Sequence, residues 1–315
     1  MTSQVPIRIA LGNFDGIHRG HRRVIDPVLR SPPISSFSTP IATAVVSFTP
    51  HPQSFFTGQQ RPLLTPLAER RDYLQSIGVD QLILLDFDAQ MAALSPQEFV
   101  DQVLVKQLGT EFISVGQNFR FGHQRSGTAD ALQQMAAAQG IPVHITPLYR
   151  CGADRISSSA IRDALAAGEV ETANRLLGRP YCLIGPVVHG QKLGRTIGFP
   201  TANLALPADK FLPSLGVYAV YVTLESQTPS TTANDIPGNR DHVSLPGVMN
   251  LGYRPTVDGV QQTAEVHLLD WSGDLYGQVL TVQLQEFLRP EQKFGGVDAL
   301  KDQIAQDCER ARSLL

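Results

Sequence analysis

The chain has 315 residues, 42% of them hydrophobic and 17% charged, which predicts two domains of ordinary size and excludes disorder throughout. Its formal net charge is −3 and it contains no polybasic run, so we expect no nucleic-acid partner. Its apolar runs are far shorter than the roughly 18 residues that span a bilayer, so we expect no membrane association.

The first half of the chain, residues 1–180, alternates short apolar runs with helical patterns. The apolar runs predict buried strands at residues 7–11, 42–48, 81–85, 112–115 and 143–147. Helical spacing and end signals predict helices at residues 20–30, 66–77, 95–108 and 128–139, and we expect Pro27 to kink or split the first of them. Repeated strand–helix–strand order predicts a parallel sheet with helices on its faces. Ligands of such sheets bind beyond the carboxyl ends of the strands.

The second half, residues 181–315, follows a different pattern, which begins near residues 178–180. Longer β-rich runs at residues 181–188, 217–224, 263–269 and 278–287 are separated by turn residues, which predicts an antiparallel barrel or sandwich. Residues 297–314 predict a terminal amphipathic helix, with Val297, Leu300, Ile304 and Cys308 on one face. Residues 31–40 and 226–239 are rich in Ser, Thr, Pro or Asn and predict exposed loops. We therefore expect two domains, residues 1–180 and 181–315.

Residues 12–21, GNFDGIHRGH, directly follow the first predicted strand. Glycines let the backbone turn sharply and approach a ligand, and the N–H groups at a helix start attract an anion. His18 and His21 are three residues apart and share a helix face, which suits them to donate hydrogen bonds to phosphate oxygens. The alternatives are a surface loop with two histidines and, less favoured because a third ligand is missing nearby, a zinc site. The candidate phosphate-binding residues of the loop are Gly12, Asn13, Phe14, Asp15 and Gly16.

Three later segments of the first half carry further candidates. His51, after the second predicted strand, either contacts a nucleotide or orders a proline turn. Residues 116–127 follow the fourth strand and offer the ligand-binding candidates Asn118, Phe119 and Arg125, with Phe119 equally compatible with the core. A triple-serine turn is typical of a helix N-cap whose hydroxyl and N–H groups face a phosphate, and an arginine follows on the same helix face: Ser157, Ser158, Ser159 and Arg162. A plain N-cap is the alternative.

The H-x-G-H sequence at His18 and His21 resembles the signature of the nucleotidylyltransferase superfamily, and the serine-rich turn before Arg162 resembles its second signature. With the segments after the second and fourth strands, residues 5–178 resemble the FMN adenylyltransferase domain of prokaryotic bifunctional riboflavin kinase/FAD synthetases. The resemblance implies a Rossmann-like α/β fold in which the two histidines contact the α-phosphate of ATP. It also implies that Ser158, Ser159 and Arg162 bind the leaving pyrophosphate, and that the loop at residues 116–127 binds the flavin.

Residues 185–203, GPVVHGQKLGRTIGFPTAN, form a second glycine-rich constellation. They are not a P-loop, because the spacing from Gly190 to Gly194 is one residue short and Arg195 stands in place of the lysine of that motif. Their backbone amides still suit phosphates, and the Thr201 hydroxyl and Asn203 amide are hard oxygen ligands for Mg²⁺. The alternative is a glycine-rich barrel corner.

The G-R-x-x-G-F-P-T-A-N string resembles the riboflavin kinase family, as do residues 247–256 and 264–269. The resemblance implies a small closed β-barrel in which Thr201 and Asn203 meet Mg²⁺ and the ATP phosphates, with phosphate-binding support from Gly190, Gly194, Arg195, Gly198 and Pro200. Strand alternation places Glu265 and His267 on one face. Glu265 is predicted as the catalytic base, with a structural ion pair as the alternative, and His267 is interpreted as structural. The residues predicted to contact the flavin are Asn250, Arg254 and Arg289.

Together the two resemblances imply FAD biosynthesis from riboflavin. The second domain would phosphorylate riboflavin to FMN with ATP and Mg²⁺, and the first would adenylylate FMN with ATP to FAD, releasing pyrophosphate. A flavin carrier with inactive sites is disfavoured because the candidate reactive residues are all present: His18, His21, Thr201, Asn203 and Glu265. A tRNA-binding protein is disfavoured because residues 181–315 hold ten basic and fourteen acidic residues, a net charge of −4.

The three cysteines, Cys151, Cys182 and Cys308, show no CxxC spacing, so we expect neither a disulfide framework nor a cysteine-rich zinc site. The N-terminal residues lack a basic region followed by an apolar run, so we expect no secretory signal. Both observations favour a cytoplasmic setting, and neither indicates an oligomeric state.

Overall fold

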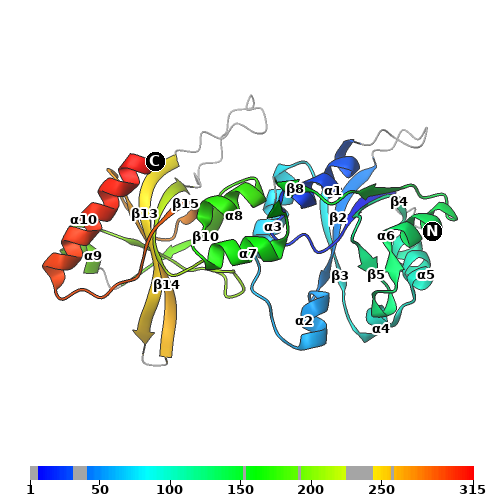
Figure 1. Cartoon of the computed structure of the whole chain (residues 1–315), viewed down its shortest axis with the longest axis horizontal. Helices are drawn as coiled ribbons and strands as arrows, with labels where there is room; N and C mark the ends of the chain where they lie inside the picture. The colour runs from blue at the N-terminus through cyan, green and yellow to red at the C-terminus, as the bar shows by residue number, and fades with distance from the viewer. Residues whose placement is uncertain (1–5, 31–40, 152–153, 191–192, 225–243, 257–258) are drawn as a thin grey trace. The chain divides into compact units, whose positions relative to one another are not determined.

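The computed structural model describes residues 6–30, 41–151, 154–190, 193–224, 244–256 and 259–315 (Figure 1). The chain divides into two compact units, Met1–Ser158 and Ser159–Leu315. The predicted loops at residues 31–40 and 226–239 lie outside the described residues. Among the helices that are described, none is both long and apolar enough to cross a membrane.

The first unit is built on a five-stranded parallel sheet with the strand order β3-β2-β1-β4-β7. Its strands are β1 (Ile7–Leu11), β2 (Ala42–Thr49), β3 (Gln81–Asp86), β4 (Thr110–Gly116) and β7 (Val143–Thr146). The predicted parallel sheet is confirmed. Because all five strands run the same way, their carboxyl ends meet at one edge, where ligands of such sheets bind.

Helices cover both faces of this sheet, and the alternation of side chains along each strand explains how. In β1, Ile9 and Leu11 join one core while Ala10 joins the other. The first core also holds residues of the π-helical η1 (Phe99–Gln107) and of α6 (Ala129–Ala137). The second core holds residues of α1 (Arg19–Arg30) and α3 (Leu67–Ser76). A strand buried on both faces is apolar at most positions, and in β1 only the buried Arg8 interrupts the apolar run.

Helix α1 contains Pro27 and still runs as one helix from Arg19 to Arg30, so the expected split does not occur. Proline lacks the N–H that would bond to the carbonyl four residues earlier, which here belongs to Arg23. The hydroxyl of Thr146 on β7 donates to that carbonyl at 3.3 Å. The sheet therefore satisfies the acceptor that the proline leaves without its helical donor.

The first unit contains several shorter elements. The predicted helix at residues 95–108 begins as α5 (Pro96–Glu98) with a complete capping box and continues as η1, whose hydrogen bonds have the wider π-helical spacing. The others are α2 (Pro52–Thr57), α4 (Ala89–Ala93), β5 (Arg120–Phe121), η2 (His123–Arg125), β6 (Gly127–Thr128), β8 (Arg150–Cys151) and β9 (Asp154–Arg155). Helix α7 (Ser158–Ala166) begins at the last residue of this unit.

The second unit is a closed antiparallel barrel with the strand order β10-β11-β14-β13-β12-β15, so the barrel, not the sandwich, is the correct alternative. Its strands are β10 (Tyr181–Val188), β11 (Ala202–Leu204), β12 (Gly216–Leu224), β13 (Ser244–Thr256), β14 (Gly259–Leu268) and β15 (Val279–Pro290). Its helices besides α7 are α8 (Val170–Leu177), α9 (Leu193–Thr196) and α10 (Val297–Leu314), and α10 has the predicted bounds.

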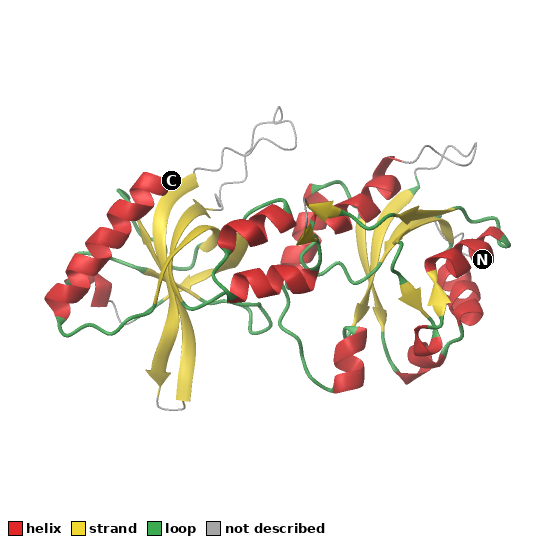
Figure 2. Cartoon of the chain, viewed as in Figure 1, coloured by secondary structure: helices red, strands yellow, loops and turns green. Residues whose placement is uncertain are grey.

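The terminal helix lies on the outside of the barrel, beside β13 (Figure 2). Alternate residues such as Val220, Met249 and Leu284 are fully buried, as expected for side chains that fill the barrel interior. The intervening residues Val217 and Val248 belong to a separate core with α10. The outer face of β12 and β13 is therefore partly covered by α10, and this face matters for the site described below.

Candidate functional site

The loop after β1 has a strained backbone that burial holds in place. Phe14 and Ile17 have φ values of 47° and 38°, in the left-handed region that non-glycine residues rarely adopt. Their side chains are 1% and 0% exposed. Strain of this kind persists only where packing over-determines the conformation, and it concentrates at functional sites. Gly16, with φ of 88°, supplies the turn between them.

A buried polar network braces this loop from a distant part of the chain. The Asp15 carboxylate accepts from the backbone N–H of Thr65 at 3.1 Å, and the Thr65 hydroxyl accepts from the N–H of Gly16 at 2.9 Å. Arg70 on α3 donates to the carbonyls of Asn13 and Thr65, each at 3.3 Å. Its guanidinium lies 3.7 Å from the Asp15 carboxylate. Thr65 and Arg70 were not predicted, because nothing local to residues 65–70 indicates a contact with residues 13–16.

The two predicted histidines lie together where α1 begins. Their rings stack with centroids 3.6 Å apart and planes 14° from parallel. The N–H of His21 donates to Nδ1 of His18 at 3.1 Å, so that nitrogen is an acceptor and carries no proton. In the neutral ring the proton must then sit on Nε2, which makes His18 a hydrogen-bond donor at that atom. A side chain at Gly20 would press on the His18 ring, which explains the small residue between the histidines.

The serine-rich turn contacts the same loop. The Ser158 hydroxyl, at the first residue of α7, donates to the Asp15 carbonyl at 2.7 Å. Ser157 is half-buried and Ser159 is exposed. Arg162 belongs to the second compact unit, where it is buried and its guanidinium lies 5.7 Å from the ring centroid of Phe211.

The flavin candidates of the first unit surround the β5–β6 hairpin. Asn118 and Arg125 are exposed. Phe119 stacks on Phe121 with centroids 5.7 Å apart and packs against the core, so it presents only part of its ring. His51 accepts from the N–H of Gln53 at 3.1 Å and caps α2, as the proline-turn interpretation requires.

A cluster of phenylalanines follows β2 and was not predicted. Phe55 and Phe56 on α2 each make edge contacts with Phe87, at centroid distances of 5.4 and 5.9 Å. Phe56 is 69% exposed although it is large and apolar. Two adjacent phenylalanines in a proline-containing turn were the signal that could have found this cluster.

In the second unit, strand pairing aligns three predicted residues in one row on the outer face of the barrel. Glu265 on β14 pairs with Asn203 on β11 and, on its other side, with Asn250 on β13. Directly paired residues of antiparallel strands point the same way, with Cβ atoms about 5 Å apart. Val266 and Leu268 are buried on the opposite face, as strand alternation predicted. All three row residues are half-buried.

The turn before β11 adds a hydroxyl and close backbone to this row. The Thr201 hydroxyl donates to the Glu265 carboxylate at 3.5 Å. A side chain at Gly190 would overlap the Asn203 amide, and one at Gly194 would overlap the carbonyl of Phe199. Both glycines are therefore required for close approach, not for flexibility. The result is a set of hard oxygen donors from a hydroxyl, an amide and a carboxylate.

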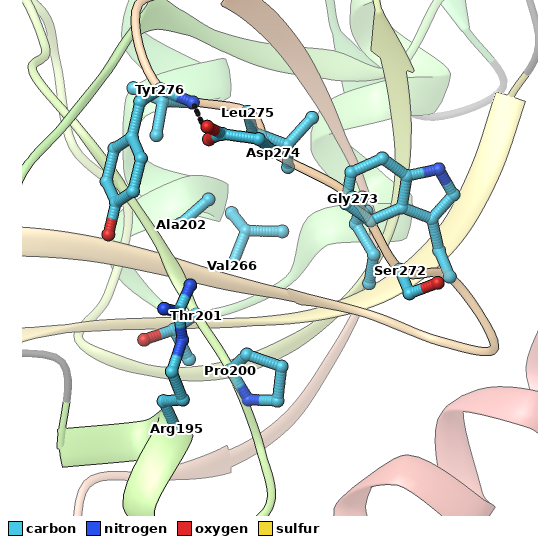
Figure 3. A pocket seen from close by; sticks show the side chains of 13 residues that line it. Arg195, Pro200, Thr201, Ala202, Val266, Ser272, Gly273, Asp274, Leu275 and Tyr276 are labelled. Atoms are coloured by element: carbon cyan, nitrogen blue, oxygen red, sulfur yellow. Dashed lines mark hydrogen bonds between the residues drawn. The ribbon is translucent and has the colours of Figure 1, made fainter.

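A cavity of about 240 Å³ lies beside the Thr201 turn (Figure 3). The cavity is lined by inward-facing barrel residues such as Ala202 and Val266 and by the loop after β14. The loop contributes the aromatic rings of Trp271 and Tyr276, which were not predicted. Figure 3 shows the side chain of Arg195 extending from α9 toward Thr201. The cavity thus combines aromatic surface with a cation beside the Thr201 hydroxyl, whereas the side chains of Asn203 and Glu265 do not line it.

Arg289 lies beside the row but is bound to α10. Strand pairing places it next to Val217, which itself pairs with Asn250. Its Nε and Nη2 atoms donate to the Asp307 carboxylate at 3.0 and 2.7 Å. The side chain of Arg254 lies outside the described residues. The predicted flavin contacts of both arginines remain predictions.

Each unit thus offers groups suited to phosphate transfer, a hydrogen-bond donor at His18 in the first and the Glu265 carboxylate beside hydroxyl and amide oxygens in the second. Among the described residues, no group of three His, Cys, Asp or Glu is arranged to hold a metal ion, so zinc ligands of that kind are not found there. In class, the chain is a nucleotide-dependent transferase with two sites.

Comparison with known families narrows this class. The FAD synthetase family matches residues 2–160 and the riboflavin kinase family matches residues 177–315. The chain belongs to the family of bifunctional riboflavin kinases/FMN adenylyltransferases. It is 41% identical to the protein of that name from Escherichia coli (strain K12) over 305 residues, which covers 96% of this chain and 91% of the relative. The corresponding proteins of Pseudomonas fluorescens and Bacillus subtilis (strain 168) are 40% and 33% identical, and the matches cover 96% of this chain and 91% and 90% of the relatives.

A solved structure also resembles the whole chain. The crystal structure titled as a macrolide-efflux protein from Streptococcus pneumoniae is 31% identical, with a TM-score of 0.80. The match covers 98% of this chain and 94% of that one. Its title differs from the names of the curated relatives, whose sequences are closer to this chain.

Proposed function

We propose that the two units divide the two activities named for this family: the barrel phosphorylates riboflavin, and the parallel-sheet unit adenylylates FMN. ATP is the second substrate of both steps. The observation that carries the first assignment is the row of Asn203, Glu265 and Asn250 with the Thr201 hydroxyl 3.5 Å from the Glu265 carboxylate.

In the kinase step, the 5′-hydroxyl of riboflavin attacks the γ-phosphorus of ATP. The new O–P bond forms as the bond to the β-phosphate oxygen breaks, and ADP leaves. Glu265 accepts the hydroxyl proton, which its half-buried position between two amide side chains suits it to do. The products are FMN and ADP.

Thr201 and Asn203 are the residues that would hold Mg²⁺. Their hydroxyl and amide oxygens are hard donors of the kind that this ion prefers, and the Glu265 carboxylate next to Thr201 adds negative charge. When bound, the ion would neutralise charge on the phosphate oxygens. The adjacent cavity suits the nucleoside of ATP, because Trp271 and Tyr276 provide aromatic surface and Arg195 a cation for phosphate.

In the adenylyl step, a phosphate oxygen of FMN attacks the α-phosphorus of a second ATP and pyrophosphate leaves. This nucleophile is already an anion at neutral pH, so no general base is needed and catalysis rests on positioning and charge stabilisation. His18 is suited to this because its Nε2 carries the proton and donates. His21 stacks on it, and the braced loop supplies backbone amides. Ser158, Ser159 and Arg162 are proposed to bind pyrophosphate.

The exposed Phe56 after β2 suits the flavin ring system in this unit. Phe56 offers an uncovered ring at the carboxyl edge of the sheet, and Phe119 offers part of one after β4. Asn118 and Arg125 are proposed as polar contacts. Aromatic stacking of this kind contributes beyond the buried area alone.

Two complementary variants test this division of labour in one chain. His21→Ala should lower FAD formation from FMN and ATP by about 10²–10³-fold, the usual cost of a lost transition-state contact, and leave FMN formation unchanged. Glu265→Gln should lower FMN formation by a similar factor while supplied FMN is still converted to FAD. Chromatography of riboflavin, ATP and Mg²⁺ mixtures, scored for FMN, FAD, ADP and pyrophosphate, measures both.

Matched controls are available in both units. His144 is an exposed histidine on β7, and Glu286 is a half-buried acid on β15 that pairs with Arg310. His144→Ala and Glu286→Gln should behave as wild type. Equal loss of both activities in His21→Ala would refute the separation, and riboflavin phosphorylation at the wild-type rate by Glu265→Gln would remove Glu265 as the base. A protein that binds flavin but turns over neither substrate would be a carrier.

A further inference from the structure

Strand β14 presents a second polar side chain on the face that carries Glu265. This is His267, two residues further along, which the sequence analysis interpreted as structural. Its Nδ1 atom lies 2.8 Å from the carbonyl oxygen of Pro200. A carbonyl oxygen can only accept, so Nδ1 must carry a proton and donate. The contact joins β14 to the residue directly before Thr201.

The ring of His267 is held on a second side as well. The Phe199 ring meets it edge-on, with centroids 5.6 Å apart and planes 78° apart. His267 therefore contacts both residues that precede Thr201. Pro200 has no N–H of its own, so its carbonyl is its sole backbone hydrogen-bonding group. A donor at this carbonyl fixes a residue that cannot donate to a strand ladder.

Two side chains of strand β14 thus form hydrogen bonds with neighbouring residues of the turn before β11. His267 donates to the Pro200 carbonyl, and Glu265 accepts from the Thr201 hydroxyl. Pro200 and Thr201, which make these two contacts, are adjacent in the chain. Rotation of the Pro200 peptide would move the Thr201 hydroxyl relative to the Glu265 carboxylate, and the His267 bond resists that rotation.

We propose that His267 is a positioning residue of the kinase site, which fixes the Pro200–Thr201 turn so that the Thr201 hydroxyl faces Glu265 and the bound nucleotide. This rests on the proposed function of the barrel as the riboflavin kinase. His267 itself touches neither substrate. Its effect is transmitted through one carbonyl, so it should appear in nucleotide binding and not in flavin binding.

Three substitutions separate a donor at Nδ1 from other roles of the ring. His267→Asn places an amide N–H where Nδ1 was, His267→Gln places one closer to the position of Nε2, and His267→Ala removes both. His267→Ala and His267→Gln should raise the KM for ATP in riboflavin phosphorylation by about tenfold, the effect of one lost hydrogen bond. His267→Asn should restore it to within about threefold of wild type, and the riboflavin KM should stay constant in all three.

Two further measurements make the outcome decisive. The Kd for ADP with Mg²⁺, measured by calorimetry, should change in the same direction as the KM for ATP in each variant. Because this Kd does not depend on turnover, it tests the proposal even if Glu265 is not the base. FMN adenylylation by the same chain and the exposed control His144→Asn should be unchanged. The proposal is overturned if His267→Asn behaves as His267→Ala, if nucleotide affinity is unchanged throughout, or if both KM values rise together with a lower thermal midpoint. Should the alanine variant not fold, the comparison of the Asn and Gln variants, which fill similar volumes, decides.

Discussion

Arg289 shows how one side chain can be bound structurally at the border of a binding site. It was predicted to contact the flavin, and on the barrel a single strand, β12, separates it from Asn250. Its guanidinium, however, makes a two-point contact with Asp307, which also accepts from Gln303 at 3.1 Å. Asp307 is 5% exposed, so the pair is shielded from water. This pair therefore attaches α10 to the barrel, and the flavin contact of Arg289 stays a prediction.

Removing one member of this pair should therefore reduce stability. Asp307→Ala leaves a partly buried guanidinium without its carboxylate, and we expect a loss of about 2 kcal/mol in the free energy of unfolding, below the range for fully buried pairs. Urea denaturation followed by fluorescence measures it. Asp302→Ala is the matched control, because Asp302 is an exposed acid on the same helix. An unchanged stability with a raised riboflavin KM would show instead that the pair serves the flavin.

A second ion pair at the end of α10 is more exposed to solvent. Arg312 contacts Asp270, which lies in the turn after β14, at 3.0 Å. The hydrogen bond and the positive charge of Arg312 lower the pKa of the Asp270 carboxyl below its ordinary value. Burial raises the pKa of the Cys308 thiol on the inner face of α10 to about 11, so that thiol stays protonated. Helix α10 therefore contacts the barrel through ion pairs and through neutral buried side chains such as Cys308.

At the scale of an element, the loop after β1 depends on α3 through Arg70. This side chain is 6% exposed, and it donates to the carbonyls of Asn13 and Thr65 while lying near the Asp15 carboxylate. Arg70→Met should lower FMN adenylylation by at least about tenfold, since the loop that precedes His18 loses its brace and a misplaced catalytic group is costly. Riboflavin phosphorylation by the same chain should not change. Steady-state assays of the two reactions measure this.

Two companion variants separate the brace from a general loss of folding. Arg71→Met changes the neighbouring arginine, whose side chain is 68% exposed, and should have no effect. Arg70→Met combined with Asp15→Asn removes the buried carboxylate that the first change leaves without its cation, and should regain stability but not activity. Recovery of full adenylylation by the double variant would contradict a bracing role.

The elements themselves were largely predictable, and the exceptions have physical causes. Buried strands such as β1 and β10 matched their predicted bounds because apolar runs and adjacent turn residues mark them locally. The continuity of α1 through Pro27 was not predictable, because it depends on the Thr146 hydroxyl from a strand far along the chain. The same holds for Thr65 and Arg70. A motif indicates which residues react, but the residues that hold it are set by tertiary contacts that leave no local pattern.

At the scale of the whole molecule, the barrel begins at Tyr181 but the compact unit begins earlier, at Ser159. The change of sequence pattern near residues 178–180 locates the first strand, and the predicted domain boundary there remains a prediction. Within the second unit, the N–H of Ser214 donates to the carbonyl of Leu165 on α7 at 2.9 Å. Phe287 of β15 packs on Gly168, where a side chain would be crowded. The segment that precedes the barrel therefore packs against it.

Asn174 on α8 makes the most specific of these contacts. Its amide donates to the carbonyl of Leu284 on β15 and accepts from the N–H of Tyr181 on β10, both at 2.8 Å. These groups lie on two adjacent strands of the barrel, so one side chain links the strands at the point where β10 begins. Without α8, both backbone groups would lack their partner, and each such loss costs about 1–3 kcal/mol when buried.

A fragment of residues 159–315 should consequently fold and phosphorylate riboflavin with the KM values of the full chain, whereas residues 181–315 should unfold at a lower urea concentration or precipitate. Asn174→Ala within the longer fragment should cost about 2 kcal/mol of stability, the sum expected for two lost bonds that water partly replaces. Glu171→Ala, an exposed change on the same helix, should cost nothing measurable. If the two fragments have the same urea midpoint of unfolding, α7 and α8 do not unfold cooperatively with the barrel and do not stabilise it. If only the shorter fragment unfolds at a lower urea concentration or precipitates, residues 159–180 are required for the stability of the kinase unit, although they precede its first strand.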